Sequence, residues 1–340
     1  MPRVVLAVDG NAIVHRAFHS QAASGFRGAD GQPMWAVRGL LAQLVAAVDR
    51  VDPDLVVVGF DDADASIRRE RWPQYKAQRP DKLATLVDQL AAAADVLHEL
   101  GVQVVIPAGL EADDVLASVA AQAPSLGATT VVMTSDRDAF GLIDAHTRVL
   151  RIINGGVEAS PMLTPERLRL LLGVRPEQYR DFAALRGDPS DNLPGVRGFG
   201  PRTAARLLAA LGSVRAALED LDAGGARVAE AIGPARAARL AEPVARSAWE
   251  LNCQVMTMHA DVSVDLTGAV GALPLPAAAV RATYAAQDLH WTTAAALRAL
   301  AHDGSAPVPS SVEPSWASRP SRRGHPPLPA RRPSDQLVLF

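Results

Sequence analysis

Cysteine, lysine and aromatic residues are scarce in this chain of 340 residues. The single cysteine, Cys253, excludes an internal disulfide, and we expect a buried, unreactive thiol. Aromatic residues make up only 4% of the chain although 49% is hydrophobic, so alanine carries much of the apolar count and the core should be rich in helix. No run approaches the roughly 18 uncharged apolar residues of a transmembrane helix. A predicted strand follows Met1-Pro2-Arg3 directly, which leaves no room for a signal peptide. We expect a cytoplasmic protein of one large or two modest domains with no membrane partner.

Lysine occurs only at Lys76 and Lys82, although the chain has 34 lysine and arginine residues in total. Both lie in segment 62–82, which has many charges and no apolar period. A site that needs a compact, movable ammonium group would retain lysine in such a chain, and chance is the competing explanation. The segment is either a functional loop or a solvated surface loop.

Three apolar runs end at an aspartate. Residues 4–8 lead into Asp9, 56–60 into Asp61 and 131–135 into Asp136. Short, β-branched runs are typical of buried parallel strands. A fourth predicted strand at 102–106 and helical spacing near 36–50, 83–100 and 112–122 complete an α/β fold with a central, mostly parallel sheet flanked by helices. Ligands bind outside the carboxyl ends of such strands, so we expect the aspartates to converge on one cleft.

Further carboxylates follow the same strands or stand in the segment Gly187-Asp188-Pro189-Ser190-Asp191. They are Glu111, Asp113, Asp114, Asp138, Asp188 and Asp191. Nine carboxylates in one cleft would repel each other and bind protons unless cations neutralise them. Oxygen ligands without histidine or cysteine suit Mg²⁺ or Mn²⁺. The pattern therefore favours a divalent-metal phosphodiester hydrolase. The net charge of −3 does not exclude a nucleic-acid substrate, because removing nine acids from the count leaves +6.

From about residue 165 to 300 the apolar spacing is helical, and a glycine-rich turn interrupts it. Gly195, Gly198 and Gly200 permit a tight turn before Pro201, which suits the first turn of a helix. A helix start with free N–H groups is a phosphate site, although such a turn alone is equally often a plain connector. We predict a core at 1–165, including segment 62–82, and a helical region at 166–303.

Residues 304–340 contain eight prolines and five arginines without periodicity, which predicts a disordered tail. The last five residues, Gln336-Leu337-Val338-Leu339-Phe340, are nevertheless apolar. A chance apolar end, a strand packed back onto the fold and a short motif that binds a partner all remain open.

In combination, these motifs resemble the 5′-nuclease (flap endonuclease) family, specifically the 5′–3′ exonuclease domain at the N-terminus of bacterial DNA polymerase I. The resemblance covers roughly residues 3–290. It rests on Val8-Asp9-Gly10, His15-Arg16-Ala17-Phe18-His19, Phe60-Asp61, Tyr75-Lys76-Ala77-Gln78-Arg79, Glu111-Ala112-Asp113-Asp114, Ser135-Asp136-Arg137-Asp138, the segment from Gly187 to Gly195 and the glycine turn. It implies a PIN-like core, a helical arch at 62–82 and a helix–three-turn–helix that grips duplex DNA.

The resemblance also implies roles for single residues. Asp9, Asp61, Glu111 and Asp113 match the residues around a first metal, and Asp136, Asp138, Asp188 and Asp191 those around a second, with Asp114 in support. Lys76, Arg79 and Asp136 are the expected catalytic residues. His15 stands where relatives often have a stacking tyrosine, and a merely packed or polar histidine is an equal alternative. The expected DNA-binding residues are His15, Arg16, Tyr75, Gly195, Arg197, Gly198, Gly200, Arg202 and Thr203, and relatives can hold K⁺ at the 195–203 turn.

The resemblance predicts two-metal hydrolysis of branched or nicked DNA with a 5′ single-stranded end, or of RNA–DNA primer junctions, in replication and repair. The tail lies outside the resemblance, and its end is similar to the pentapeptide by which bacterial proteins bind the β sliding clamp. Gln336, Leu337, Leu339 and Phe340 would make that contact. A PIN-type ribonuclease would have no reason for the glycine turn, and a non-catalytic DNA-binding protein would have no reason for the carboxylates.

Overall fold

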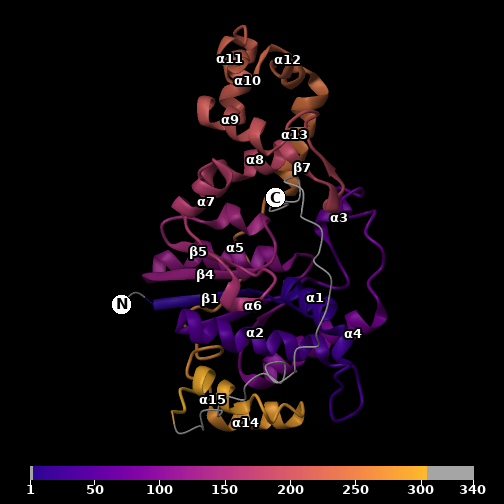
Figure 1. Ribbon diagram of the computed structural model, residues 1–340, viewed down its shortest axis with the longest axis vertical. Helices are drawn as coiled ribbons and strands as arrows, with labels where there is room; N and C mark the ends of the chain where they lie inside the picture. Colours follow the sequence, from indigo (N-terminus) through magenta and orange to yellow (C-terminus); the bar gives the residue numbers. More distant parts are fainter. Residues whose placement is uncertain (1–2, 305–340) are drawn as a thin grey trace, which may run out of the picture. The chain divides into compact units, whose positions relative to one another are not determined.

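The computed structural model of the protein describes residues 3–304 and contains a six-stranded sheet (Figure 1). The strand order is β3-β2-β1-β4-β5-β6, and every neighbouring pair is parallel except β5 and β6. The strands are β1 (Arg3–Asp9), β2 (Leu55–Gly59), β3 (Gln103–Val105), β4 (Ala128–Thr134), β5 (Thr147–Arg151) and β6 (Met162–Leu163). The predicted α/β fold is confirmed. Strands β5 and β6 were not predicted.

Alternate residues of β1 face two separate cores. Leu6 and Val8 pack into one core, and Val5 and Ala7 into the other. Because both faces of the central strand are covered, the sequence of β1 is a continuous apolar run. The first core includes α1 (Gly10–Gln21), α2 (Trp35–Val51) and α4 (Ala84–Leu100), with α14 (Ala277–Ala286) and α15 (Thr293–Ala301) packed against them. The second core includes α5 (Ala112–Gln122) and continues into the helical region.

The part of the helical region from Pro165 to Val255 lies on the α5 side of the sheet, whereas α14 and α15 lie on the opposite side (Figure 1). Asp181, in helix α8 (Tyr179–Arg186), is partly buried and fastens two neighbouring helices, because its carboxylate accepts hydrogen bonds from the indole N–H of Trp249 at 3.1 Å and the backbone N–H of Val214 at 2.8 Å. Cys253 is half-buried, and burial followed by the nearby Asp181 raises the pKa of its thiol to about 12, which keeps it unreactive. The helices are α7 (Pro165–Leu172), α8 (Tyr179–Arg186), α9 (Pro201–Leu211), α10 (Val214–Asp222), α11 (Ala226–Ile232), α12 (Pro234–Ala241) and α13 (Pro243–Val255).

Several short elements connect these layers. Segment 62–82, predicted as an arch, contains only the short helix α3 (Ile67–Arg71), followed by turns. The other short elements are α6 (Gly156–Ala159), β7 (Gly187–Asp188), β8 (Leu193–Pro194) and the 3-10 helices Ala22–Ser24, Ala123–Leu126, Asp138–Leu142, Pro176–Gln178 and Pro189–Asp191. Within residues 3–304, no helix combines the length and apolarity needed to cross a bilayer. The predicted tail and its terminal motif lie outside the described residues, apart from Gly304.

The order of the strands defines where a ligand should bind. From β1 the chain builds the sheet in one direction through β2 and β3, and in the other through β4 and β5. The direction reverses between β1 and β4, and ligands of open α/β sheets bind at the carboxyl ends of the strands beside such a reversal. Asp9 ends β1, and Asp136 follows β4 by two residues.

Candidate metal and nucleic-acid site

A buried threonine connects the carboxylates at the reversal point. The hydroxyl of Thr134 donates to Asp9 Oδ2 at 2.7 Å and accepts the backbone N–H of Asp136 at 3.0 Å. Asp9 also caps α1, since its Oδ1 accepts the N–H of Ala12 at 2.8 Å. These bonds fix the ends of β1 and β4 relative to each other.

Asp61 is held by the two helices on either side of it. Its Oδ2 accepts the amide of Asn11 at 2.8 Å, and its Oδ1 accepts the N–H of Ala112 at 3.0 Å. Asn11 in turn accepts the backbone N–H of Asp61 at 3.0 Å. The carboxylate after β2 is therefore oriented by α1 and by the start of α5.

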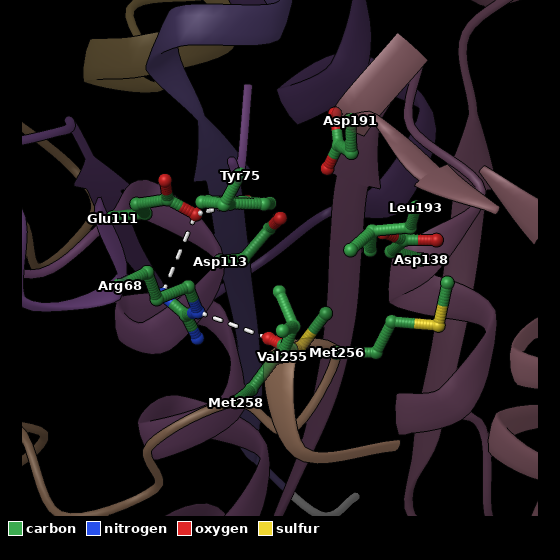
Figure 2. Close-up of a pocket in the computed structure, with 10 residues that line it drawn as sticks. All are labelled: Arg68, Tyr75, Glu111, Asp113, Asp138, Asp191, Leu193, Val255, Met256 and Met258. Atoms are coloured by element: carbon green, nitrogen blue, oxygen red, sulfur yellow. Dashed lines mark hydrogen bonds and ion pairs between the residues drawn. The ribbon is translucent and has the colours of Figure 1, made fainter. Parts of the chain in front are cut away.

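The carboxylates of Glu111, Asp113, Asp138 and Asp191 line one pocket with Arg68, Tyr75, Leu193, Val255, Met256 and Met258 (Figure 2). The carboxylate of Glu111 accepts a hydrogen bond from the ammonium group of Lys76 at 2.8 Å and another from the hydroxyl of Tyr75 at 3.1 Å. Asp113 differs, because its Oδ1 is buried and has no hydrogen-bond partner in residues 3–304. A buried acceptor without a donor is costly, and it marks the place in the pocket where a cation would be stabilised.

Burial, with repulsion between neighbouring carboxylates added to it, raises the pKa values of several members of the set. Burial raises the pKa of Asp9 to about 7, with Asp61 and Asp136 adding to the effect. Burial, then Asp136, Asp188 and Asp191, raise the pKa of Asp138 to about 8. The pKa of Asp113 is raised well above its usual value by burial and then by Asp9, Asp136, Asp138 and Glu111. Eight of the nine predicted carboxylates thus influence one another.

The donor set fits a hard divalent cation. All eight groups offer oxygen, burial and neighbouring carboxylates raise the pKa values of Asp9, Asp113 and Asp138, and Asp113 Oδ1 has no donor among residues 3–304. Within residues 3–304, however, no three carboxylate, histidine or cysteine side chains are gathered closely enough to enclose an ion as they stand. Two of the carboxylates form ion pairs with cationic side chains instead, since Lys76 pairs with Glu111 and Arg79 pairs with Asp191.

The segment that carries Lys76 and Arg79 is docked onto the loop after β7. The N–H of Lys76 donates to the carbonyl of Asp191 at 3.0 Å, and Arg79 Nε donates to the carbonyl of Ser190 at 3.1 Å. In the other direction, the side-chain amide of Asn192 donates a hydrogen bond from Nδ2 to the carbonyl of Gln74 at 2.8 Å. Lys76 adopts φ +56°, a left-handed conformation that is unfavourable for a residue with a Cβ. The bonds on both sides of Lys76 hold it there and direct its ammonium into the acidic cluster.

The structure corrects our prediction that Asp114 supports the metal site, because its carboxylate is turned toward Arg68. Both of its oxygens accept bonds from Arg68 at 2.7 Å, and they also accept the N–H groups of Glu111 at 2.9 Å and His259 at 2.8 Å. With no exposed surface, Asp114 positions the start of α5 and is not placed to bind a metal.

Arg68 was missed by the sequence analysis. It is 5% exposed, and besides Asp114 it reaches the carbonyls of Val255 at 3.2 Å and Thr257 at 3.0 Å. It therefore joins α3, α5 and the end of α13. In the sequence it is one of three arginines in the run Ile67-Arg68-Arg69-Glu70-Arg71, and nothing in that pattern distinguishes it.

Two residues predicted to contact DNA differ in their exposure. Tyr75 is 5% exposed and packs with Leu193 and Val255 while its hydroxyl bonds to Glu111, so the prediction that it contacts DNA is wrong for this conformation. His15 is half-buried, and burial together with the nearby Lys82, His19 and Arg79 lowers the pKa of its imidazole to about 4. His15 is therefore neutral at physiological pH.

The glycine turn precedes α9, as predicted. Arg197 and Arg202 are exposed there, and Thr203 is partly exposed. Gly195 has a packing role, since a Cβ on it would lie 2.1 Å from the carbonyl oxygen of Arg186. Gly198 has φ +86°, and nothing lies within 4 Å of a Cβ placed on Gly200. The open backbone of this turn, with arginines on both sides, can accept a phosphate.

Two family models match successive parts of the chain. The N-terminal resolvase-like domain of 5′–3′ exonucleases matches residues 4–169, and the C-terminal SAM fold of 5′–3′ exonucleases matches residues 174–273. The chain belongs to the 5′–3′ exonuclease family. Residues 274–304, which contain α14 and α15, lie outside both matches.

Curated relatives of this family member are DNA polymerases. DNA polymerase I of Mycobacterium tuberculosis is 38% identical over 228 residues, which are 67% of this chain and 25% of the polymerase. The thermostable DNA polymerase I of Thermus aquaticus is 38% identical over 218 residues, which are 64% of this chain and 25% of the polymerase. The chain thus spans about a quarter of the length of these relatives.

Solved structures share the fold. The T5 5′-exonuclease with bound divalent metal ions (zinc) aligns with a TM-score of 0.53 and 18% identity, over 75% of this chain and 100% of that one. The catalytic core of Rad2 in complex with a DNA substrate aligns with a TM-score of 0.55 and 16% identity, over 88% of this chain and 92% of that one. At these identities the comparison supports the fold alone.

Proposed function

We propose that this member of the 5′–3′ exonuclease family is a structure-specific 5′ nuclease that hydrolyses phosphodiesters of 5′ flaps, nicks and RNA–DNA primer junctions. One observation carries the proposal. Eight interacting carboxylates from separate segments meet at the carboxyl edge of the sheet, and one buried oxygen among them, Asp113 Oδ1, has no donor within residues 3–304. The proposed biological setting is DNA replication and repair.

The carboxylates divide into two proposed metal-binding groups. Asp9, Asp61, Glu111 and Asp113 would hold one Mg²⁺ or Mn²⁺, and Asp136, Asp138, Asp188 and Asp191 would hold the other. When bound, the ions supply Lewis acidity at the scissile phosphate and at the leaving 3′ oxygen. We place Asp136 between the two groups.

The protein's own cations act on the phosphate. Burial works against the charged form of Lys76, but Glu111 and Asp191 outweigh burial and raise its pKa, so its ammonium stays charged at neutral pH. Once released from Glu111, this ammonium can reach a phosphate beside the carboxylates and stabilise charge that develops there. Arg79 would do the same from the edge of the cluster, where its side chain is 46% exposed.

Duplex DNA would be held away from the cluster by the turn before α9. Arg197, Arg202, Thr203 and the exposed backbone at Gly198 and Gly200 supply donors to backbone phosphates, and K⁺ could bind at this turn. His15 and Arg16 of α1 would contact the strand nearer the cluster. Because such contacts read phosphates and not bases, binding should depend steeply on salt and little on sequence.

The test is cleavage of a 5′-labelled flap duplex with Mg²⁺ or Mn²⁺, with Asp136→Asn as the inactive variant. We expect metal-dependent cuts at the flap junction in the unmodified protein and none in the variant. Binding without cleavage would instead identify a non-catalytic DNA-binding protein. Cleavage of single-stranded RNA in preference to the flap would identify a PIN-type ribonuclease.

Lys76→Ala tests the proposed catalytic ammonium, and Lys82→Ala is the matched control because it is the other lysine of the chain and is exposed. Lys76→Ala should lower turnover by about 10²-fold or more with little change in duplex affinity, as expected for a group that acts in the transition state. Equal turnover in the two variants would remove Lys76 from the mechanism.

We further propose that Gln336, Leu337, Leu339 and Phe340, which lie outside the described residues, bind the β sliding clamp. An apolar pentapeptide on a proline-rich linker suits a partner's groove and would raise the local concentration of nuclease at nicks. Binding of the full chain to immobilised clamp should be lost in Leu337→Ala/Phe340→Ala while flap cleavage without clamp is retained. Unchanged binding would refute the proposal.

A further inference from the structure

Three arginines gather on the β5 side of the carboxylate cluster. Arg151 is the last residue of β5 and lies opposite Thr134 in the parallel register, Arg137 stands between Asp136 and Asp138, and Arg16 lies on α1. They are close enough to interact, because after burial it is Arg137 and then Arg16 that lower the pKa of Arg151. Like charges held together are unfavourable unless an anion joins them.

The guanidinium groups of this arginine cluster (Arg16, Arg137 and Arg151) have unused donors. The Nε of Arg151 is buried without a hydrogen-bond partner among residues 3–304, while its guanidinium lies 5.7 Å from the centre of the Phe140 ring. Arg16 donates to the side-chain oxygen of Asn154 at 2.7 Å, a neutral partner. None of the three forms an ion pair in the described part of the chain.

The opposite flank of the carboxylate cluster is arranged differently. There, Lys76 pairs with Glu111, which follows β3, whereas Arg151 ends β5 at the other side of the central strands. Of the three arginines, Arg137 lines a hollow together with Asp138 and Asp188, so this part of the arginine cluster opens toward the carboxylates. A strand crossing the carboxylates would therefore meet cations on both sides.

We propose that Arg16, Arg137 and Arg151 form a second phosphate site, which holds an internal backbone phosphate of the cleaved strand on the side of the scissile bond away from Lys76. The inference rests on the proposed nuclease function and adds to it the path of the strand. Guanidinium groups bind phosphate through paired N–H donors, and within residues 3–304 no carboxylate pairs with those of Arg16, Arg137 or Arg151. The contact carries no sequence information, so it positions the strand without selecting bases.

The decisive variant is Arg151→Gln, and Arg148→Gln is its matched control because Arg148 is exposed on the same strand, three residues earlier. Both are made in the Asp136→Asn background, and flap-DNA affinity is measured by fluorescence anisotropy across a salt series. Loss of one charged phosphate contact should weaken binding about 10-fold or more in Arg151→Gln. It should also reduce the slope of log K against log salt by about one. Arg148→Gln should change neither quantity, and Arg151→Lys should recover part of the affinity.

Methylphosphonate substitution of one phosphate at a time then locates the contact. In the Asp136→Asn protein each contacted phosphate shows a penalty when it is neutralised, and in Arg151→Gln the penalty at one internal position should disappear. The same penalties in Arg151→Gln and Arg148→Gln would overturn the proposal. So would a penalty lost only at a 5′-terminal phosphate, since the site would then hold the strand end.

Failure of the proposed function gives a different result. In that case the unmodified protein would not cut the flap, whether or not it binds it. The arginine inference fails alone when the unmodified protein cuts the flap and Arg151→Gln binds it as tightly as Arg148→Gln does. Arg137→Gln provides a second variant at a loop position if Arg151→Gln unfolds, and it should show the same change in salt slope.

Discussion

Replacing Arg68 by methionine should destabilise the protein more than any other single arginine substitution on α3. The side chains of Arg68 and Asp114 are 6% and 0% exposed, and two bonds of 2.7 Å join them. Methionine preserves much of the aliphatic stem but removes all five N–H donors. Asp114 would keep only its two backbone N–H donors, and the carbonyls of Val255 and Thr257 would lose theirs.

The magnitude follows from the uncompensated charge. Removing one partner of a buried ion pair costs about 3–5 kcal/mol, because the remaining charge stays out of water. Replacing an exposed arginine changes the free energy of unfolding by no more than about 0.5 kcal/mol. Arg69 is the matched control, since it neighbours Arg68 on the same short helix and is exposed. The expected difference between Arg68→Met and Arg69→Met is therefore at least about 3 kcal/mol.

Urea unfolding followed by far-ultraviolet circular dichroism measures the difference, with the m-value checked for each variant. Asp114→Asn completes a double-mutant cycle, and the double variant should lose less stability than the two single variants together, by about 1–3 kcal/mol. Equal midpoints for Arg68→Met and Arg69→Met, or strict additivity in the cycle, would show that Arg68 does not fasten α3 to the start of α5.

Three further results are expected. Folding raises the pKa values of Asp9 and Asp138 from 3.8 to about 7 and about 8. Between pH 3.8 and these raised values, the folded protein without metal therefore binds more protons than the unfolded chain, and its stability falls as the pH rises. In EDTA its Tm should therefore fall from pH 5 to pH 8, and Mg²⁺ should raise the Tm more at pH 8; a Tm that rises with pH in EDTA would contradict the assignment. Tyr75→Phe should cost about 1–3 kcal/mol, the value of a hydrogen bond to a charged group, yet leave flap-DNA affinity in anisotropy unchanged, because the side chain is buried; a several-fold loss of affinity would restore Tyr75 to the DNA contacts. Gly195→Ala should abolish soluble folded protein, since its Cβ would lie 2.1 Å from a backbone oxygen, whereas Gly200→Ala should be near neutral by thermal melting; a stable Gly195→Ala protein would refute the packing role.

The strands and the positions of their carboxylates could be predicted because each strand is a local pattern. Strands β1 and β2 are each almost entirely apolar, and a carboxylate directly after such a strand lies at the carboxyl edge wherever the strand stands in the sheet. Asp9, Asp61 and Asp136 needed no knowledge of strand order. The two-residue strand β6 and the arginine-bearing β5 lacked such a run and were missed.

Partners that are distant in the sequence could not be predicted. Asp114 and Arg68 are separated by 46 positions, and the choice between a metal ligand and an ion-pair partner depends on which of three arginines in one short helix turns inward. Tyr75 was assigned to DNA for the same reason, because its packing against Val255 depends on the path of a chain segment 180 residues later.

The arrangement of charges explains how a chain of net charge −3 can bind a polyanion. The acidic side chains are concentrated at one place. Burial there raises the pKa values of Asp9 and Asp138, so these two groups carry less negative charge at neutral pH than exposed aspartates would. Cations stand on both flanks, Lys76 already paired and Arg151 unpaired with any carboxylate in residues 3–304. Net charge averages over this separation, so it reports neither the acidic centre nor its basic borders. Local potential governs where a phosphate binds, and here it changes sign within one sheet edge.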